Sequence, residues 1–254
     1  MTRSGSEAGV RPGRPDDVVA MAALAEMKRE QYRDNASPFQ VPALDARSVH
    51  EAFLAKLLVC DGFLVAVHDG PEGIDGFIVA RVGSAPPPFG EGALFHVDDF
   101  MVTAPSLWTT VGRALLRHVA GEAAAAGATK AIVVSGSRAV DAPKVDFLAG
   151  LGLLCEAEWW VKQIEPTHDQ PVATKGFEAI VGPAPPVYKS GGPTCLATHI
   201  ESPEALQQLE RFAAASRAVI VIVPTLASRD DLRQELRDRD YIVASEWYTG
   251  TRLS

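Results

Sequence analysis

A short apolar segment carries two side chains that could move a proton. His96 and Asp98 lie two residues apart, so the alternation of a strand places both on one side with Phe100 and Val102, and Asp99 on the other, up to any bulge. A histidine can deprotonate an ammonium near neutral pH, and a carboxylate can orient it or bind the amine. The pattern favours His96 as a base. The alternative is that His96 is a partly buried strand residue and the aspartates bind backbone or solvent.

The residues that follow this segment suit an anion. A predicted helix over residues 109–126 opens with small residues, and the first amides of a helix have no intrahelical partners. Such a start can hold a pyrophosphate, with a glycine for close approach and an arginine for charge. The residues concerned are Thr109, Thr110, Val111, Gly112, Arg113 and Ala114. The alternative is that Thr109 caps the helix and Gly112 packs against the neighbouring strand. Neither the P-loop pattern nor GxGxxG occurs in the sequence.

The elements that must position these residues alternate between helical and strand patterns. Apolar periodicity predicts helices over residues 18–32, 46–58, 109–126 and 142–151, and strands over 10–11, 63–68, 74–80, 93–102, 130–134 and 158–164. The strands at 63–68 and 74–80 are expected to form an antiparallel hairpin. The fold class is therefore α+β, a mixed central sheet flanked by helices.

A second, smaller unit is expected after a linker. Residues 166–193 are rich in proline and glycine, with one segment, 177–181, that could pair as a strand. Strands and helices then alternate over residues 194–200, 203–215, 218–223, 230–239 and 241–247, the same order as between residues 93 and 164. We therefore expect a first domain over residues 1–165, and a linker plus a degenerate, partial repeat over residues 166–254.

Composition excludes several classes of protein. The 254 residues carry 24 Lys and Arg against 32 Asp and Glu, a formal charge of −8 without a basic block, so nucleic acid is not an expected partner. Cys60, Cys155 and Cys195 are far apart, and the histidines are scattered, so neither a disulfide framework nor a metal site is expected. A polar N-terminus and short apolar runs predict a cytoplasmic chain without membrane spans.

In its first two-thirds the sequence resembles the GNAT acetyltransferases. That family has a strand ending in an apolar-x-Val element, followed by a Q/R-x-x-G-x-G/A turn that opens a long helix. Here Phe100-Met101-Val102 matches the strand end and Thr109-x-x-Gly112-x-Ala114 the turn. The resemblance covers about residues 10–164, including Val-Arg-Pro at the start and the segment from 147 to 153 near the end.

The resemblance implies a cofactor and a mechanism. In this family the strand splays at a bulge, and backbone groups equivalent to those of Phe100, Met101 and Val102 pair with the pantetheine arm of acetyl-CoA. The amides from Thr109 to Ala114 would hold the pyrophosphate. An amine then attacks the thioester directly in a ternary complex, with a base taking its proton and an acid protonating the thiolate.

The sequence also departs from the family. Thr109 replaces Gln or Arg, and the loop after Val102 is longer than usual. Leu148 stands where the family often has the tyrosine that protonates the thiolate. That role would pass to Ser135 or Ser137, to water, or to no group.

The resulting expectation is an N-acetyltransferase that uses acetyl-CoA as co-substrate, needs no metal, and acts on a small cationic amine, with a protein N-terminus or lysine as the alternative acceptor. His96, Asp98 and Ser135 are its expected catalytic residues. Loops 33–42 and 85–92 would form the acceptor pocket. The second unit, whose turn Glu201-Ser202-Pro203-Glu204 would repel a pyrophosphate, would extend the sheet, close that pocket or form a homodimer. A non-catalytic acyl-CoA sensor or scaffold is the first alternative, and a CoA-independent interaction protein the second.

Overall fold

The computed structural model describes residues 9–33, 40–85, 89, 91–167, 174–189 and 191–251. Its strands are β1 (Val10–Pro12), β2 (Phe63–Gly70), β3 (Gly73–Ser84), β4 (Ala93–Val102), β5 (Lys130–Gly136), β6 (Leu154–Gln163), β7 (Phe177–Gly182), β8 (Thr194–Ile200), β9 (Ile220–Leu226) and β10 (Ile242–Gly250). Its α-helices are α1 (Val18–Arg33), α2 (Ala46–Leu57), α3 (Arg113–Ala125), α4 (Arg138–Gly150), α5 (Ala205–Ala215) and α6 (Asp230–Asp238).

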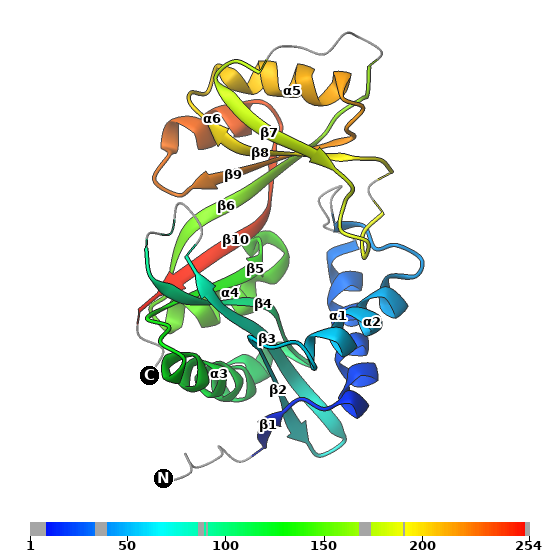
Figure 1. Cartoon of the computed structure of the whole chain (residues 1–254), viewed down its shortest axis with the longest axis vertical. Coiled ribbons are helices and arrows are strands. Elements are labelled where there is room, and N and C mark those ends of the chain that lie inside the picture. Colours follow the sequence, from blue (N-terminus) through cyan, green and yellow to red (C-terminus); the bar gives the residue numbers. More distant parts are fainter. Residues whose placement is uncertain are drawn as a thin grey trace.

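All of these strands form one sheet that runs the length of the molecule (Figure 1). Their order is β1-β2-β3-β4-β5-β10-β6-β9-β8-β7. The last strand of the chain therefore lies in the middle of the sheet, where β10 pairs antiparallel with both β5 and β6. The two parallel pairs are β4 with β5 and β8 with β9, each joined through a helix, α3 or α5.

The strand order is symmetric about the central pair of β10 and β6. Outward on one side come β5, β4 and β3, and on the other β9, β8 and β7. Each side has one parallel pair followed by an antiparallel strand. The last strand of the N-terminal part, β6, pairs with β9 of the C-terminal part, and the last strand of the C-terminal part, β10, pairs with β5. The C-terminal part therefore extends the sheet of the N-terminal part. This order supports the predicted partial repeat, which stays a prediction, as does the domain boundary at residue 165.

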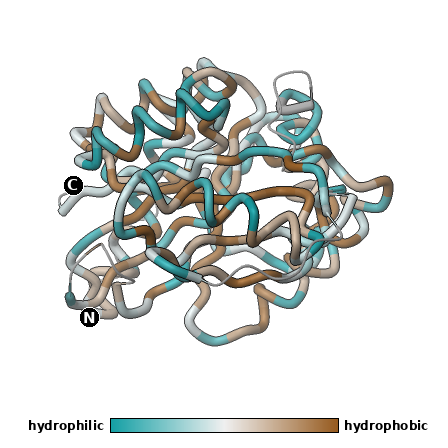
Figure 2. The backbone as a smooth tube through the Cα atoms, turned by 90° about the horizontal axis from the view of Figure 1, so that it is seen from above, coloured by the Kyte–Doolittle hydropathy of each residue, from teal (hydrophilic) through white to brown (hydrophobic). Residues whose placement is uncertain are grey.

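The helices cover the sheet unequally. One face of β3 packs Ile78 and Ala80 into a core shared with α3 and α4, and the other packs Phe77 and Val79 against α1 and α2. The helices α5 and α6 cover the C-terminal strands around Val221, on the same face of the sheet as α3 and α4. Figure 2 shows hydrophobic residues concentrated along the strands and hydrophilic residues on the outer sides of the helices.

The structure confirms the predicted mixed sheet flanked by helices, including the hairpin of β2 and β3 and a strand, β7, inside the predicted linker. Two expectations need correction. The fourth helix begins at Arg138, four residues early, and the helical path after β4 begins at Pro105, as a 3-10 turn (Pro105–Leu107) and a π-turn (Trp108–Gly112) ahead of α3. Proline suits the first turn of a helix because it lacks the N–H that would be unpaired there.

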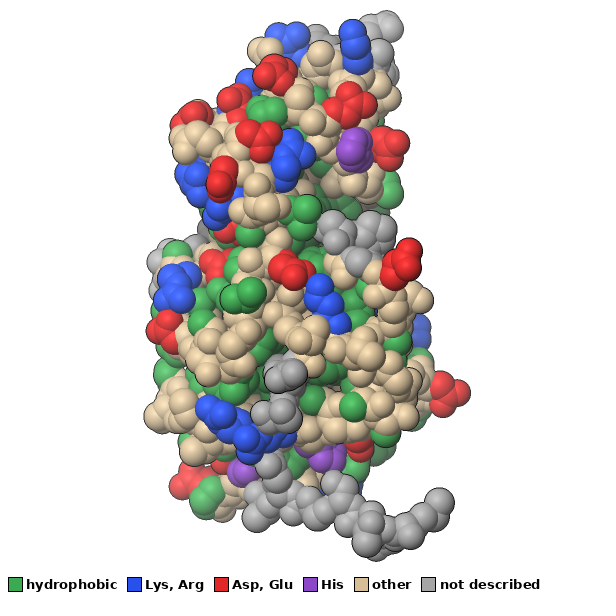
Figure 3. Space-filling model, turned by 90° about the vertical axis from the view of Figure 1, so that its left-hand side faces the viewer, with side chains coloured by type: hydrophobic (Ala, Val, Ile, Leu, Met, Phe, Trp, Pro, Cys, Tyr) green, Lys and Arg blue, Asp and Glu red, His purple; other side chains and the backbone are tan. Residues whose placement is uncertain are grey.

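Two further features concern the surface charges and the apolar character of the helices. Figure 3 shows acidic and basic side chains interspersed over the upper part of the face that it displays. In the described part of the chain, no helix combines the length and apolar character that crossing a membrane requires.

Candidate functional site

The two parallel strands β4 and β5 diverge partway along their length. Their pairing runs from Leu94 with Lys130 to Val97 with Val133, but β4 continues to Val102 and β5 to Gly136. We call the point just after Val97 and Val133 the fork. Beyond it, no strand of the described part of the chain pairs with the edge of β4 that faces β5, so the backbone groups there suit an extended ligand.

A bulge on β4 coincides with the fork. Val79 of β3 pairs with Asp99 and the next residue, Ala80, pairs with Val97, so Asp98 is the extra residue. The bulge reverses the alternation. Phe95, Val97 and Phe100 face the core shared with α3 and α4, so His96, Asp98 and Asp99 all face the α1 side. The expected shared side of His96 and Asp98 is confirmed, but Phe100 and Val102 lie on the opposite side, and Asp99 joins the first two.

A cavity of about 370 Å³ passes through the sheet at the fork. Because α1 and α4 lie on opposite faces of the sheet, a cavity lined by both must cross it. We call it the fork cavity; its lining residues are Leu24, Met27, Lys28 and Gln31 of α1, Phe100, Met101, Val102, Thr103, Pro105 and Trp108, and Val140, Asp141 and Pro143 of α4. It thus includes all three residues predicted to pair with the pantetheine arm.

One ion pair bridges the fork cavity from side to side. Lys28 Nζ of α1 lies 2.5 Å from Asp141 Oδ1 of α4, and the Asp141 side chain is 2% exposed. Ser135, at the end of β5, donates its hydroxyl to Asp141 Oδ2 at 3.3 Å. Ser135, a predicted catalytic residue, therefore lies at the fork, whereas Lys28 and Asp141 were not predicted.

A second polar chain fixes the β4 side of the fork. Arg29 Nη1 lies 3.0 Å from His50 Nδ1, and His50 Nε2 lies 3.0 Å from Asp99 Oδ2. A guanidinium can only donate, so Nδ1 accepts from Arg29 while Nε2–H donates to Asp99. Burial raises the pKa of Asp99, but the His50 hydrogen bond and the charges of Lys144 and Arg29 outweigh it and hold that pKa below its usual value.

The C-terminal part of the chain reaches this site. Residues 41–43 pair with residues 187–189: Pro42 bridges Tyr188, Ala43 N–H donates to Val187 at 3.0 Å, and Lys189 N–H donates to Val41 at 2.7 Å. Burial, and then the charge of Asp99, raise the pKa of Tyr188 to about 12. The segment before β8 therefore places the Tyr188 phenol close enough to Asp99 for the charge of the aspartate to affect the phenol's pKa.

A buried lysine lies behind the fork. Lys144 Nζ donates to the Val134 carbonyl at 2.8 Å and lies over the rings of Phe100 and Trp108, 5.5 and 5.8 Å from their centroids. Burial lowers the pKa of Lys144 to about 8. Lys144 stands one helical turn before Leu148, so the two share a face of α4. Its amine is thus near the place where the resemblance implies a tyrosine.

The predicted base lies beside the fork but outside the fork cavity. His96 is on the part of β4 that is still paired with β5, opposite Ile132, and its ring packs against Trp247 with centroids 5.3 Å apart. Its Nδ1 lies 2.7 Å from Asp98 Oδ1, but neither ring nitrogen has a well-directed hydrogen bond to any described residue. Asp98 also pairs with Arg81 at 3.3 Å. His96 and Asp98 are therefore neighbours, as expected, but do not line the fork cavity.

The predicted anion site has a different geometry. Only two residues, Thr103 and Ala104, separate β4 from the helical path, so the expectation of a long loop was wrong. The 109–114 segment lies one turn inside the helix, where the Arg113 N–H already bonds the Trp108 and Thr110 carbonyls. Thr109 and Arg113 line a second cavity of about 290 Å³ between this helix and α4, which shares Pro105, Trp108 and Pro143 with the fork cavity. Thr110 is exposed, Val111 is buried and Ala114 is half-buried.

Gly112 serves the packing of Trp108. A Cβ on Gly112 would lie 2.8 Å from Trp108 Cε3. We expect Gly112→Ala to lower the free energy of unfolding by ~1–3 kcal/mol, because overpacking outweighs the better helix propensity of alanine. Gly121→Ala, in the same helix and with open space around it, should instead raise it by up to ~1 kcal/mol. Urea unfolding of both variants checks this, and a stabilised Gly112→Ala would show that Trp108 yields easily.

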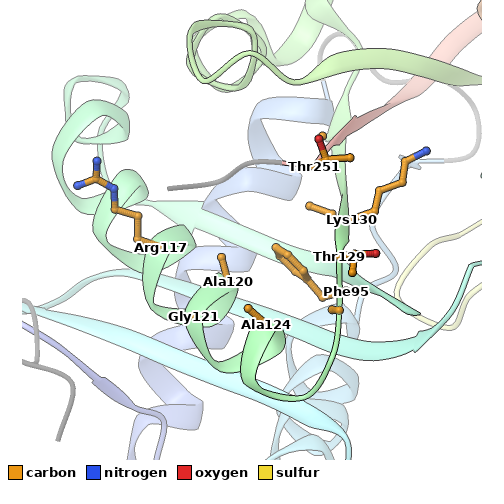
Figure 4. A pocket seen from close by; sticks show the side chains of 11 residues that line it. Phe95, Arg117, Ala120, Gly121, Ala124, Thr129, Lys130 and Thr251 are labelled. Carbon is orange, nitrogen blue, oxygen red and sulfur yellow. The ribbon is translucent and has the colours of Figure 1, made fainter. Parts of the chain in front are cut away.

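Another cavity, of about 400 Å³, lies away from the fork. It is lined by the C-terminal half of α3, by Phe95 and by the start of β5 (Figure 4), at the opposite end of the β4–β5 pair from the fork. Its lining of alanines, with Arg117 and Lys130 among them, brings no acid or base pair together. Parts of both expected acceptor loops, residues 34–39, 86–88 and 90, lie outside the described residues. Among the residues that are described, no three His, Cys, Asp or Glu side chains are grouped as a metal site would require.

Comparison with known proteins finds similarity of structure. No protein-family profile and no curated protein sequence matches the chain. Among solved structures, an acetyltransferase from Vibrio fischeri is 14% identical, covers 49% of this chain and 93% of its own, and has a TM-score of 0.37. PaiA N-acetyltransferase from Thermoplasma acidophilum, solved with coenzyme A, is 10% identical, with coverage of 58% and 89% and a TM-score of 0.46. An aminoglycoside 6'-N-acetyltransferase from Acinetobacter baumannii is 10% identical, with coverage of 54% and 87% and a TM-score of 0.43.

The bulge on β4 and its divergence from β5 match the resemblance described above. The resemblance implies a strand that bulges and then diverges from its parallel neighbour. In this chain Asp98 forms the bulge, and β4 diverges from β5 at the fork. The chain therefore has a mixed central sheet flanked by helices, with the bulge and the diverging strand pair that the resemblance implies.

Proposed function

We propose that the chain is an N-acetyltransferase that moves an acetyl group from acetyl-CoA to a primary amine of a small cationic acceptor, by direct attack in a ternary complex. The observation that carries the proposal is the fork cavity, which crosses the sheet beside an unpaired strand edge. Such a passage lets a thioester enter from the α4 side and meet an amine that arrives from the α1 side.

The unpaired edge of β4 suits the pantetheine arm. That arm is extended and contains two amide groups, so it can pair with free backbone groups as an added strand does. Phe100, Met101 and Val102 supply these groups and line the cavity.

The adjoining cavity suits the phosphate end. The helical path that begins at Pro105 presents its positive end where the two cavities meet, and Arg113 adds a charge beside Thr109. The pyrophosphate site thus involves Thr109 and Arg113 from the predicted set, while Val111 and Gly112 support it by packing.

Several acidic groups surround the acceptor side. Asp98 and Asp99 lie on the α1 face of β4, and Asp141 borders the fork cavity. Their negative charge favours a cationic amine. His96 stays a candidate for the base, but the geometry favours Asp141, because its carboxylate lines the cavity and the imidazole does not.

Turnover with a panel of small amines tests the proposal. We expect acetyl-CoA consumption to depend on an added amine, Asp141→Asn to lower kcat by ~10²–10⁴-fold as loss of a general base does, and His96→Gln to lower it by less than ~10-fold. A His96→Gln variant that loses the pH dependence of kcat/KM, with Asp141→Asn unchanged, would return the base to His96. Binding of acetyl-CoA without turnover of any amine would favour the non-catalytic alternative.

A further inference from the structure

The ion pair of Lys28 and Asp141 crosses the sheet through the fork. Lys28 belongs to α1 and Asp141 to α4, on opposite faces, and both line the fork cavity. The Lys28 side chain is 16% exposed and that of Asp141 2%. An ammonium of the chain itself thus lies in the passage where an acceptor amine would have to meet the thioester.

The backbone of α4 is broken to place this carboxylate. Asp141 has φ −135° and ψ 38° inside an otherwise helical segment, and Pro143 follows two residues later. The carboxylate binds the Lys28 ammonium through Oδ1 and the Ser135 hydroxyl through Oδ2. A buried carboxylate needs such partners, because burying it unpaired costs several kcal/mol. The Lys28 ammonium therefore occupies the position beside the Asp141 carboxylate that the ammonium of a cationic ligand could occupy.

We propose that Lys28 is itself an acceptor, and that the chain acetylates the Lys28 amine when acetyl-CoA is bound and no other amine competes. This inference rests on the proposed function. It also explains the preference for cationic amines, because a substrate ammonium would displace Lys28 from Asp141 and take over the same contact.

The transfer balances with the groups present. Asp141 accepts a proton from the Lys28 ammonium, and the freed amine attacks the thioester carbonyl carbon. A C–N bond forms, the C–S bond breaks, and the electron pair leaves with sulfur. The thiolate takes a proton from Ser135, which regains it from Asp141. The Asp141 carboxylate then accepts the second proton that the acylated nitrogen loses and releases it to solvent, so the products are N-acetyl-lysine, the free thiol of CoA and one proton.

The test is the site and rate of self-acetylation. The full chain is incubated with acetyl-CoA without an amine, digested, and mapped by mass spectrometry. We expect Lys28 to be acetylated at least ~100-fold faster than Lys56, an exposed lysine of α2, because a positioned amine reacts intramolecularly. In urea the two rates should become similar. Lys28→Arg keeps the charge opposite Asp141 and should abolish the modification, Lys56→Arg should not, and Asp141→Asn should slow it.

The outcomes separate this inference from the proposed function. Acetyl-CoA binding is measured first, by calorimetry on the same sample. Binding with Lys28 modified no faster than Lys56 would overturn the inference and leave the proposed function standing. Absence of binding to folded protein would overturn both. Rapid acetylation of Lys28 that persists in Asp141→Asn would keep Lys28 as acceptor and overturn the role of Asp141.

Discussion

Replacing Val140 by tryptophan should abolish the binding of acetyl-CoA. Val140 lines the fork cavity from α4, opposite the free edge of β4, so an indole there would fill the space proposed for the pantetheine arm. A micromolar ligand binds with about −8 kcal/mol, and excluding the arm from its groove should remove at least ~3 kcal/mol of this, a weakening of ~100-fold or more. Equilibrium dialysis against labelled acetyl-CoA measures the change.

A matched control separates blocking from misfolding. Val59→Trp makes the same substitution at a side chain that is 78% exposed and lines neither cavity near the fork, so its affinity should equal that of the wild type. Thermal unfolding of both variants establishes that they are folded. A folded Val140→Trp variant that binds as tightly as Val59→Trp would place the arm outside the fork cavity.

Replacing Lys144 by methionine should stabilise the fold at pH 7. Burial lowers the pKa of Lys144 from its ordinary 10.5 to about 8, which at ~1.4 kcal/mol per pH unit corresponds to about 3 kcal/mol. Below pH 8 both the folded and the unfolded chain hold this proton, so the fold bears the whole cost of burying the charge. Methionine fills a similar volume between Phe100 and Trp108 without it.

The pH dependence identifies the cause of this gain. Between pH 8 and 10.5 the unfolded chain holds the Lys144 proton and the folded chain does not, so wild-type stability rises with pH relative to the variant. The advantage of Lys144→Met, up to about 3 kcal/mol at pH 7, should therefore shrink toward zero near pH 10.5. Urea unfolding of both proteins across this range provides the comparison. A difference that does not change with pH would mean that Lys144 is not the buried charge described here.

Local pattern predicted the elements well, because each depends on neighbouring residues. The strand from residue 93 to 102 was predicted with its observed bounds, since apolar residues and turn signals delimit it. The side on which Phe100 lies could not be predicted, because a bulge depends on the register with β3 and not on the bulged residue alone.

The glycine at position 112 shows how a local motif can mislead. Its spacing predicted a helix start that binds an anion, whereas the structure assigns Gly112 to contact with Trp108, four residues before it. Pro105 carried the better signal, because a proline three residues after the strand end at Val102 favours the first turn of a helix. That signal also argues against the longer loop that was expected after Val102 as a departure from the family.

The residues of the fork come from elements that are far apart in sequence. Lys28 and Asp141 are separated by 113 positions, and His50 and Asp99 by 49, so no spacing rule joins them. For Lys144 the sequence offered only a weak indication, because it is a charged residue on the same helical face as Leu148. Nothing in the sequence indicated that β10 lies in the middle of the sheet, because its apolar residues suit any buried strand.

One contact of α6 with the sheet could not be predicted from its charge pattern. Arg233 of α6 binds both carboxylate oxygens of Glu158 on β6 at 2.9 Å. Glu158 is 8% exposed and also accepts from the Trp160 indole. The partner became visible only once the sheet had placed β6 beneath α6.

Calorimetric titration of acetyl-CoA into the wild-type chain tests the central claim most directly. If the fork cavity holds the pantetheine arm, one equivalent should bind with micromolar affinity, about −8 kcal/mol. A folded chain that releases no heat and shows no gain in melting temperature with acetyl-CoA would contradict the account, and the fold would then serve a function that does not use CoA.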